Sequence, residues 1–418
     1  MKQAYNILVI DFQYISEERN DYLSRSVDKL WTREFVLVSL INFIIMLSMF
    51  LLLVTIGGYA VEHYHVSTST AGLVSGIFIV GSLFGRFWAG KYIDIIGQKK
   101  TLVIGVIIFV VTTALYFVSF DLTVLITIRL LNGIGCGIAS TATGTIAAFI
   151  TPKKRRGEGI SYFSMSAVMA TAVGPFLGMF LLQFITFRQL FIFCLALALV
   201  ATFMLPSIKV NEDLEGLKSQ APKGLHISNF IDTNAIPIAI VVLICCTAYS
   251  SVLSFISFFA KENNMVTAGS FFFLAYAIVV LLSRPFTGRL MDTRGTNIVM
   301  IPAMLSFIAG LFSLSLTHTP MMLIISAMLL GFGYGNFLSI AQAAAVKRTE
   351  PEKIGLATST FFIFLDFALG FGPYLLGIFI PIIGLHELYF YMGIVVVIGM
   401  IVYFILHGRK AHIYDTLT

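Results

Sequence analysis

The chain carries Gly85-Arg86-Phe87-Trp88-Ala89-Gly90-Lys91-Tyr92-Ile93-Asp94-Ile95-Ile96-Gly97 and, 198 residues later, Ser283-Arg284-Pro285-Phe286-Thr287-Gly288-Arg289-Leu290-Met291-Asp292-Thr293-Arg294-Gly295. An arginine, a glycine, a basic residue, an aspartate and a second glycine stand at identical offsets in both stretches. The same shift relates further glycines in the two halves, namely Gly133, Gly135 and Gly137 with Gly331, Gly333 and Gly335, and Gly174-Pro175 with Gly372-Pro373. Several matches in one register indicate an internal duplication.

Composition places both copies in a membrane. Mean hydropathy is +0.93, 58% of the residues are hydrophobic and only 11% are charged, which excludes a soluble domain. The net charge of +6 comes from short basic clusters between apolar runs, a pattern typical of cytoplasmic loops and not of a nucleic-acid surface. Duplicated helical membrane proteins are most often transporters whose halves rock against each other.

Apolar runs long enough to cross a bilayer predict an all-α membrane protein with twelve transmembrane helices in two six-helix repeats. The predicted spans are 35–58, 70–93, 101–120, 123–149, 159–182, 187–206, 235–259, 267–290, 297–316, 320–345, 355–380 and 387–407. The four cysteines all fall inside these spans, so we expect free thiols.

Basic residues predict the orientation. They gather in alternate loops, at Lys99-Lys100, at 153–156, at 347–353 and at Arg409-Lys410. Both termini are therefore expected in the cytoplasm, with the protein in the plasma membrane. We expect a cytoplasmic extension at 1–34, six-helix bundles at 35–206 and 235–410, a cytoplasmic central loop at 207–234 and a short cytoplasmic tail at 411–418. A translation start further along the chain is the alternative for the first segment.

The two six-helix sets with the 90–100 loop resemble the major facilitator superfamily over residues from about 31 to 410. The resemblance implies a loop signature that controls opening of the cytoplasmic side. Its members here are predicted gating residues: Gly90, Asp94, Gly97, Lys99, Gly288, Asp292 and Gly295. Glycine lets helices approach, and each aspartate can face a helix N-terminus in the other half. Ile95 and Thr293 replace the family's usual basic residue after the aspartate.

Two charged residues within the spans predict proton coupling. Arg129 resembles the family's intramembrane arginine, and Asp366 is the acid placed deepest in the membrane. Their counterparts in the repeat are Ala327 and Val168, so the fold itself does not require either charge. A desolvated carboxyl group that an arginine can approach is suited to carry a proton. A substrate-binding carboxylate is the close alternative for Asp366, and a packing arginine is the alternative for Arg129.

Gly174-Pro175, within 170–178, resembles a motif of the proton-coupled exporters in this superfamily. A glycine and a proline thin and bend the helix, so we expect the second half to slide past it. The motif favours export over uptake, although Gly-Pro also occurs as an ordinary kink.

Candidates for the substrate cavity come from the spans that line it in this family. They are polar or aromatic residues: Asn42, Phe50, Tyr162, Ser166, Tyr249, Tyr334, Asn336 and Phe362. Each could equally serve ordinary helix packing.

These features predict a secondary transporter that exports a small organic molecule by proton antiport, with multidrug-type efflux as the first expectation. Export of an endogenous siderophore, amino acid or sugar is the alternative, and a membrane sensor that does not transport ranks last. No nucleotide-binding or metalloprotease motif occurs in the sequence, which argues against an enzyme or an ATPase. We expect no cofactor, metal or nucleic-acid partner, and a monomer whose partners are substrate, protons and lipid.

Overall fold

A computed structural model describes residues 30–152, 156–209, 232–347 and 354–410. In this part of the chain, eleven helices are long and apolar enough to cross a membrane. The last of them, α13, consists of two helices that meet at Gly384, where the backbone is not helical and φ is +78°, and these two helices contain the final two predicted spans. The predicted all-α architecture is therefore confirmed. Most of the predicted extension, central loop and tail lies outside the described residues.

Six helices form the first half. They are α2 (Arg33–Tyr64), α3 (Thr68–Ile96), α4 (Gln98–Leu115), α5 (Leu122–Ile150), α6 (Arg156–Leu181) and α7 (Phe187–Met204). The second half is formed by α9 (Ile236–Glu262), α10 (Val266–Arg294), α11 (Asn297–Ser315), α12 (Pro320–Lys347) and the bent α13 (Ile354–Leu406). Short 3-10 turns occur at η1 (Tyr116–Val118), η3 (Leu205–Ser207) and η6 (Gly408–Lys410).

Local sequence sets several helix ends. Thr32, Ser67, Asp121 and Thr186 each precede a helix, and their side chains accept a hydrogen bond from a backbone N–H three residues later. The repeat-related glycines Gly97 and Gly295 end α3 and α10 with φ of +99° and +91°. Side chains disfavour this backbone region, which explains glycine at both positions.

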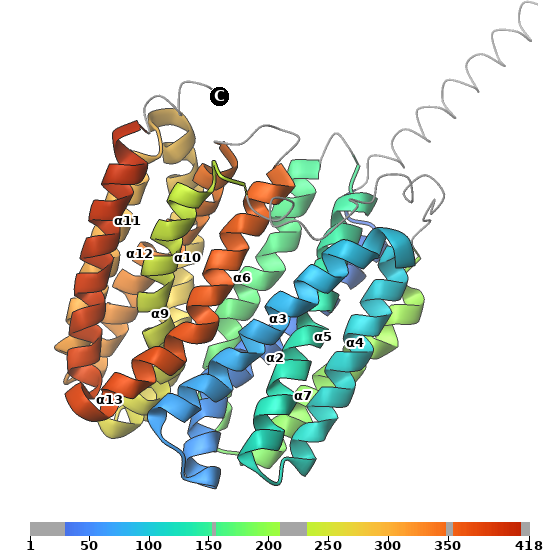
Figure 1. Ribbon diagram of the computed structural model, residues 1–418, viewed down its shortest axis with the longest axis horizontal. Coiled ribbons are helices and arrows are strands. Elements are labelled where there is room, and N and C mark those ends of the chain that lie inside the picture. The colour runs from blue at the N-terminus through green and yellow to red at the C-terminus, as the bar shows by residue number, and fades with distance from the viewer. Residues whose placement is uncertain (1–29, 153–155, 210–231, 348–353, 411–418) are drawn as a thin grey trace, which may run out of the picture.

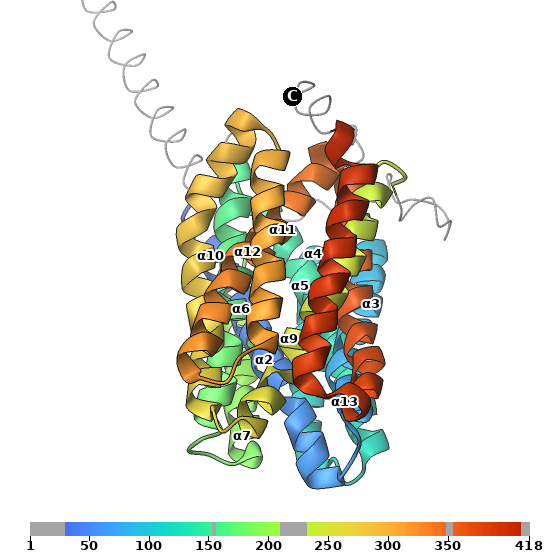
Figure 2. The same cartoon turned by 90° about the vertical axis from the view of Figure 1, so that its left-hand side faces the viewer.

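The two halves lie side by side, with the blue-to-green first half on the right of Figure 1 and the yellow-to-red second half on the left. Figure 2 shows the second half from its outer side, with α11 and the bent α13 in front. Contact between the halves runs along α3 with α13, α6 with α10, and α2 with α9. We name the two ends of the bundle by their residues. The basic end carries Gly97 and Gly295, and the histidine end carries His65 and His318.

Equivalent glycines make equivalent contacts in the two halves. A Cβ placed on Gly133 would lie 1.9 Å from the Phe78 carbonyl oxygen, and one on Gly331 would lie 2.4 Å from the Tyr276 carbonyl oxygen. Phe78 and Tyr276 are themselves 198 residues apart. Close backbone contact thus holds α5 on α3 and α12 on α10, and the sequence repeat is a repeat of helix packing.

Gly133→Ala is expected to destabilise the folded protein, because the methyl group would press into the Phe78 carbonyl. Overpacking of this kind costs about 1–3 kcal/mol. Gly58→Ala is the matched control, since nothing lies within 4 Å of a Cβ at Gly58. Thermal unfolding in detergent should show a lower midpoint for Gly133→Ala alone. An equal midpoint in both variants would contradict the packing explanation.

Candidate functional site

A partly buried ion pair joins the two halves, away from both ends of the helices that carry it. Arg86 of α3 donates from Nη1 to Oδ2 of Asp366 on α13 over 2.8 Å. The Asp366 side chain is 6% exposed and that of Arg86 is 29% exposed. Removing one partner of such a pair leaves an uncompensated charge, so the pair favours the arrangement in which α3 and α13 meet.

Phe362 lies one helical turn before Asp366, and the Arg86 guanidinium carbon lies 5.5 Å from the centre of its ring. The structure therefore brings together two predicted site residues, Phe362 and Asp366, through an arginine that sequence reasoning did not assign. The sequence did contain a reason to consider both residues. Arg86 belongs to the repeated stretch, and Asp366 is the acid that has no counterpart in the repeat.

Arg129 occupies a different place. It is fully buried, and its Nε and Nη2 donate to the carbonyl oxygens of Val74 and Ser75 over 3.1 and 3.2 Å. Its guanidinium carbon also lies 4.6 Å from the ring centre of Phe78. The structure does not bring Arg129 to the Asp366 carboxylate, and it places the Arg129 side chain where it holds α5 to α3.

A polar cluster crosses the interior of the first half. Asn42 of α2 donates to Ser166 Oγ of α6 over 2.9 Å, and Thr143 Oγ1 of α5 donates to Asn42 Oδ1 over 3.1 Å. Two of the predicted cavity residues, Asn42 and Ser166, are therefore direct partners. Thr143 was not predicted, because a single threonine in an apolar helix gives no distinctive pattern.

The second half holds a cluster of tyrosines. Tyr249 of α9 stacks on Tyr334 of α12, with ring centres 3.6 Å apart and planes at 8°. Tyr276 of α10 lies 6.0 Å from Tyr249. Asn336, also on α12, accepts a hydrogen bond from Thr287 of α10 over 2.8 Å. Of the predicted residues, the structure thus brings Tyr249 and Tyr334 into direct contact and pairs Asn336 with α10.

Tyr162 and Phe50 lie elsewhere. Tyr162 is partly exposed near the basic end and packs against Trp31, with ring centres 5.0 Å apart. Phe50 faces Gly174, where an added Cβ would lie 2.8 Å from the Phe50 Cβ. Gly174 thus lets α6 approach α2 of its own half. This differs from the expected contact with the second half, which α6 instead reaches through Phe176, 5.5 Å from Phe271 between ring centres.

The structure describes some of the predicted gating residues and not others. Gly90 and Gly288 are exposed, and among the described residues a Cβ on either would meet nothing within 4 Å. The close helix approach expected at these glycines stays a prediction. Lys99 is partly exposed in the first turn of α4. The side chains of Asp94 and Asp292 lie outside what the structure describes.

The histidine end is closed by contacts between the halves. Thr68 Oγ1 donates to the Gly377 carbonyl over 2.8 Å, and Gln183 Nε2 donates to Ser270 Oγ over 2.8 Å. At the same end α2 meets α9, where the Lys261 ammonium contacts the Glu62 carboxylate. A Cβ on Gly76 would lie 1.9 Å from the Gly370 carbonyl oxygen, so α3 and α13 touch backbone to backbone.

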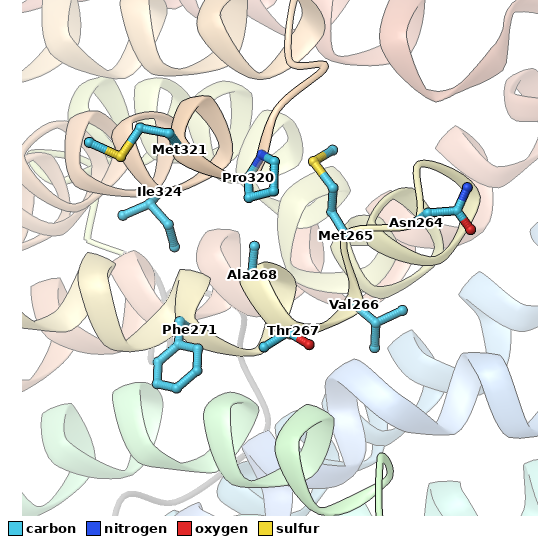
Figure 3. Close-up of a pocket in the computed structure, with 9 residues that line it drawn as sticks. All are labelled: Asn264, Met265, Val266, Thr267, Ala268, Phe271, Pro320, Met321 and Ile324. Atoms are coloured by element: carbon cyan, nitrogen blue, oxygen red, sulfur yellow. The ribbon is translucent and has the colours of Figure 1, made fainter.

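Two cavities open at the histidine end, away from the ion pair. One of about 650 Å³ lies between the starts of α10 and α12, where Met265, Phe271 and Met321 line it (Figure 3). The other, of about 760 Å³, is lined in part by Glu62 and His63. Neither contains a residue predicted for the substrate cavity.

Comparison with known proteins identifies the family of the chain. The sequence model of the Major Facilitator Superfamily matches residues 38–263 and 238–414. "Multidrug resistance protein 2" of Bacillus subtilis is 25% identical over 356 residues, 80% of this chain and 86% of that protein. The "Multi-drug resistance efflux pump PmrA homolog" of Lactococcus lactis is 26% identical over 303 residues, 69% of this chain and 74% of that protein.

Solved structures share the fold. A mutant of the nucleoside transporter NupG superposes with a TM-score of 0.75 at 13% identity, covering 90% of this chain and all of that one. A bacterial homolog of the lysosomal transporter Spinster, in an inward-facing and unoccupied conformation, gives 0.72 at 13% identity and covers 91% and 97%. The chain belongs to the major facilitator superfamily and is a multi-pass membrane transporter, not an enzyme.

Proposed function

We propose that this protein exports small amphipathic molecules in exchange for protons, by alternating access in the plasma membrane. The observation that carries the proposal is the Arg86–Asp366 pair, in which a buried carboxylate on one half meets a partly exposed arginine on the other half. Protonation of Asp366 would remove its charge and weaken the link between α3 and α13. Loss of the proton would restore the link, so that one protonation step accompanies one conformational step.

The conformation fits one half of such a cycle. The histidine end is closed, whereas Gly90 and Gly288 near the basic end contact no neighbouring helix within the described residues. If the basic end is cytoplasmic, this is the state that takes up substrate from the cytoplasm. Arg129 contributes in our proposal by fixing α5 to α3, the helix that carries Arg86. The protein is proposed to work as a monomer, because one chain contains both of the six-helix halves that move against each other.

Drug-type efflux is supported by the names of two relatives. Export of an endogenous polar product is the second candidate, and the Asn42–Ser166 pair supports it because buried amide and hydroxyl groups can bind polar ligands. A membrane sensor ranks third, since the predicted central loop of 28 residues leaves little room for a signalling domain.

Efflux from cells tests the proposal directly. Cells that lack their own exporters would be loaded with ethidium (a cation), phenylnaphthylamine (neutral) or anilinonaphthalene sulfonate (an anion). We expect faster loss of at least one dye when the protein is produced, and a protonophore should abolish the gain. Equal loss of all three dyes with and without the protein would contradict drug-type efflux and favour an endogenous product.

The proposed orientation gives a separate prediction. A cysteine at Lys100, exposed at the basic end, should react with a membrane-impermeant maleimide only from the cytoplasmic side, and one at His318 only from outside. The four native cysteines are buried, which keeps the background low. Reaction of both positions from the same side would contradict the assigned topology.

A further inference from the structure

One of the two cavities at the histidine end is lined by both charged and aromatic side chains. Its volume of about 760 Å³ is in the range of small-molecule sites, and its described lining belongs entirely to the first half. The walls come from the end of α2, from η1 with the segment that follows it, and from the start of α7. Neither Arg86 nor Asp366 lines it, so it is separate from the proposed proton-coupling pair.

Contacts between the walls hold this cavity open. Tyr59 of α2 lies 5.3 Å from Phe191 of α7 between ring centres, and Phe191 stacks on Tyr116 of η1 with ring centres 5.1 Å apart. The Tyr64 hydroxyl donates to the Ser119 carbonyl, which fastens the end of α2 to the segment after η1. The cavity is therefore formed before any ligand binds.

Two opposite charges line the cavity. Glu62 and Arg188 are both exposed, and Arg188 has no ion-pair or hydrogen-bond partner within the described residues. Lys261 of α9 contacts Oε1 of Glu62, and Oε2 has no partner in the described chain. The position of Arg188 is set by the capping box of Thr186 and Gln189 at the start of α7. The cavity thus offers an acceptor for a cation and a donor for an anion.

The cavity lies at the boundary between lipid and water. Glu62 is in the last turn of α2 and Arg188 is in the first turn of α7. Beside them, Phe117, Val118 and Phe120 are 38%, 54% and 81% exposed. Charged groups next to exposed apolar side chains at helix ends match the level at which lipid headgroups meet acyl chains. A ligand with two opposite charges and an apolar part fits both features.

We propose that this cavity binds a phospholipid whose headgroup carries a phosphate and a primary ammonium, as phosphatidylethanolamine does. Arg188 binds the phosphate, Oε2 of Glu62 accepts a hydrogen bond from the ammonium, and the segment 117–120 contacts the acyl chains. A guanidinium matches the geometry of phosphate, and a charge-assisted hydrogen bond to the carboxylate distinguishes an ammonium from the hydroxyl groups of phosphatidylglycerol. The inference goes beyond the proposed export function, and its test does not depend on transport.

The test reports which lipid lies at the cavity. A bimane fluorophore is attached to Phe120→Cys, at a residue that lines the cavity, in protein held in phosphatidylcholine nanodiscs; the native cysteines are buried. Phosphatidylethanolamine or phosphatidylglycerol with a nitroxide on one acyl chain is added, and quenching gives the relative binding of each. We expect phosphatidylethanolamine to bind about fivefold more tightly than phosphatidylglycerol. Free glycerophosphoethanolamine, which lacks acyl chains, should not relieve the quenching.

Further variants separate the two charges. Glu62→Gln should bring the ratio of the two binding constants close to one, and Arg188→Gln should weaken both lipids by about threefold or more. Both side chains are exposed, so both variants should fold as the wild type does. Lys261→Gln removes the contact from the second half and leaves Glu62 in place, so the preference should persist. Glu387→Gln and Arg289→Gln change an exposed acid and an exposed arginine outside the cavity, and they are the matched controls.

The proposal is overturned if the wild type shows no preference, if Glu62→Gln retains it, or if Lys261→Gln abolishes it. Unchanged binding of both lipids by Arg188→Gln would contradict the phosphate contact. Relief of the quenching by glycerophosphoethanolamine would assign the cavity to a soluble zwitterion and would overturn the assignment to a lipid.

Discussion

Asp366→Asn is expected to abolish transport against a concentration gradient when only a pH gradient is supplied, while exchange of dye across vesicle membranes continues. The amide resembles a carboxyl group that is permanently protonated, so the charged link to Arg86 cannot re-form in any part of the cycle. Breaking a buried ion pair costs about 3–5 kcal/mol, and the partial exposure of Arg86 places this pair at or below the lower value. Uphill transport should fall by at least about tenfold.

Three further variants separate charge from packing. Asp366→Glu should retain part of the uphill transport, because a carboxyl group remains near Arg86. Arg86→Lys should also retain part of it, although lysine lacks the planar guanidinium. Glu387→Gln, at an exposed acid of the histidine end, should behave as wild type. If Asp366→Asn still concentrates dye under a pH gradient alone, Asp366 is not the proton carrier.

The second large effect concerns two glycines that should shift the conformational equilibrium in opposite directions. Gly76→Val places a branched side chain where even a Cβ would lie 1.9 Å from the Gly370 carbonyl oxygen, so the closed histidine end should open. Gly90→Trp enters space that no described residue occupies, and it should prevent α3 from packing closely when the basic end closes. Overpacking of about 1–3 kcal/mol shifts such an equilibrium by roughly five- to 150-fold.

Distances between spin labels would report these shifts. One pair at Lys100 and Arg294 spans the basic end, and another at His65 and His318 spans the histidine end. Gly90→Trp should keep the long basic-end distance under all conditions, and Gly76→Val should shorten it. Dye efflux should fall in both, whereas Gly58→Val, in open space, should leave distances and efflux unchanged. Identical distance distributions in the two glycine variants would contradict this account of gating.

The sequence was sufficient to predict the architecture for a physical reason. Membrane spans need long apolar runs, and the 198-residue shift that relates Gly133 to Gly331 indicated a duplication. The structure shows that these two glycines make equivalent close contacts, because close helix packing needs glycine at the same place in each copy. The repeat also placed a glycine at the same offset in both stretches, Gly97 and Gly295, and both residues end a helix with positive φ.

The candidate site was less predictable. Arg86 and Asp366 are 280 residues apart and belong to different halves, so no local pattern pairs them. Arg129 attracted attention as a buried charge, yet backbone carbonyls of α3, which have no sequence signal, accept its hydrogen bonds. In the proposed cycle the packing of Gly90 depends on which end of the transporter is open, so the sequence alone does not determine it.

The central claim, exchange of protons for substrate through Asp366, is tested most directly in vesicles that contain the purified protein and a trapped pH-sensitive dye. A gradient of whichever efflux dye the cells export fastest is imposed with no initial pH gradient. The wild type should move protons in the opposite direction to that dye, in proportion to its transport, and Asp366→Asn should move the dye without protons. Dye movement by the wild type with no change in internal pH would contradict the account.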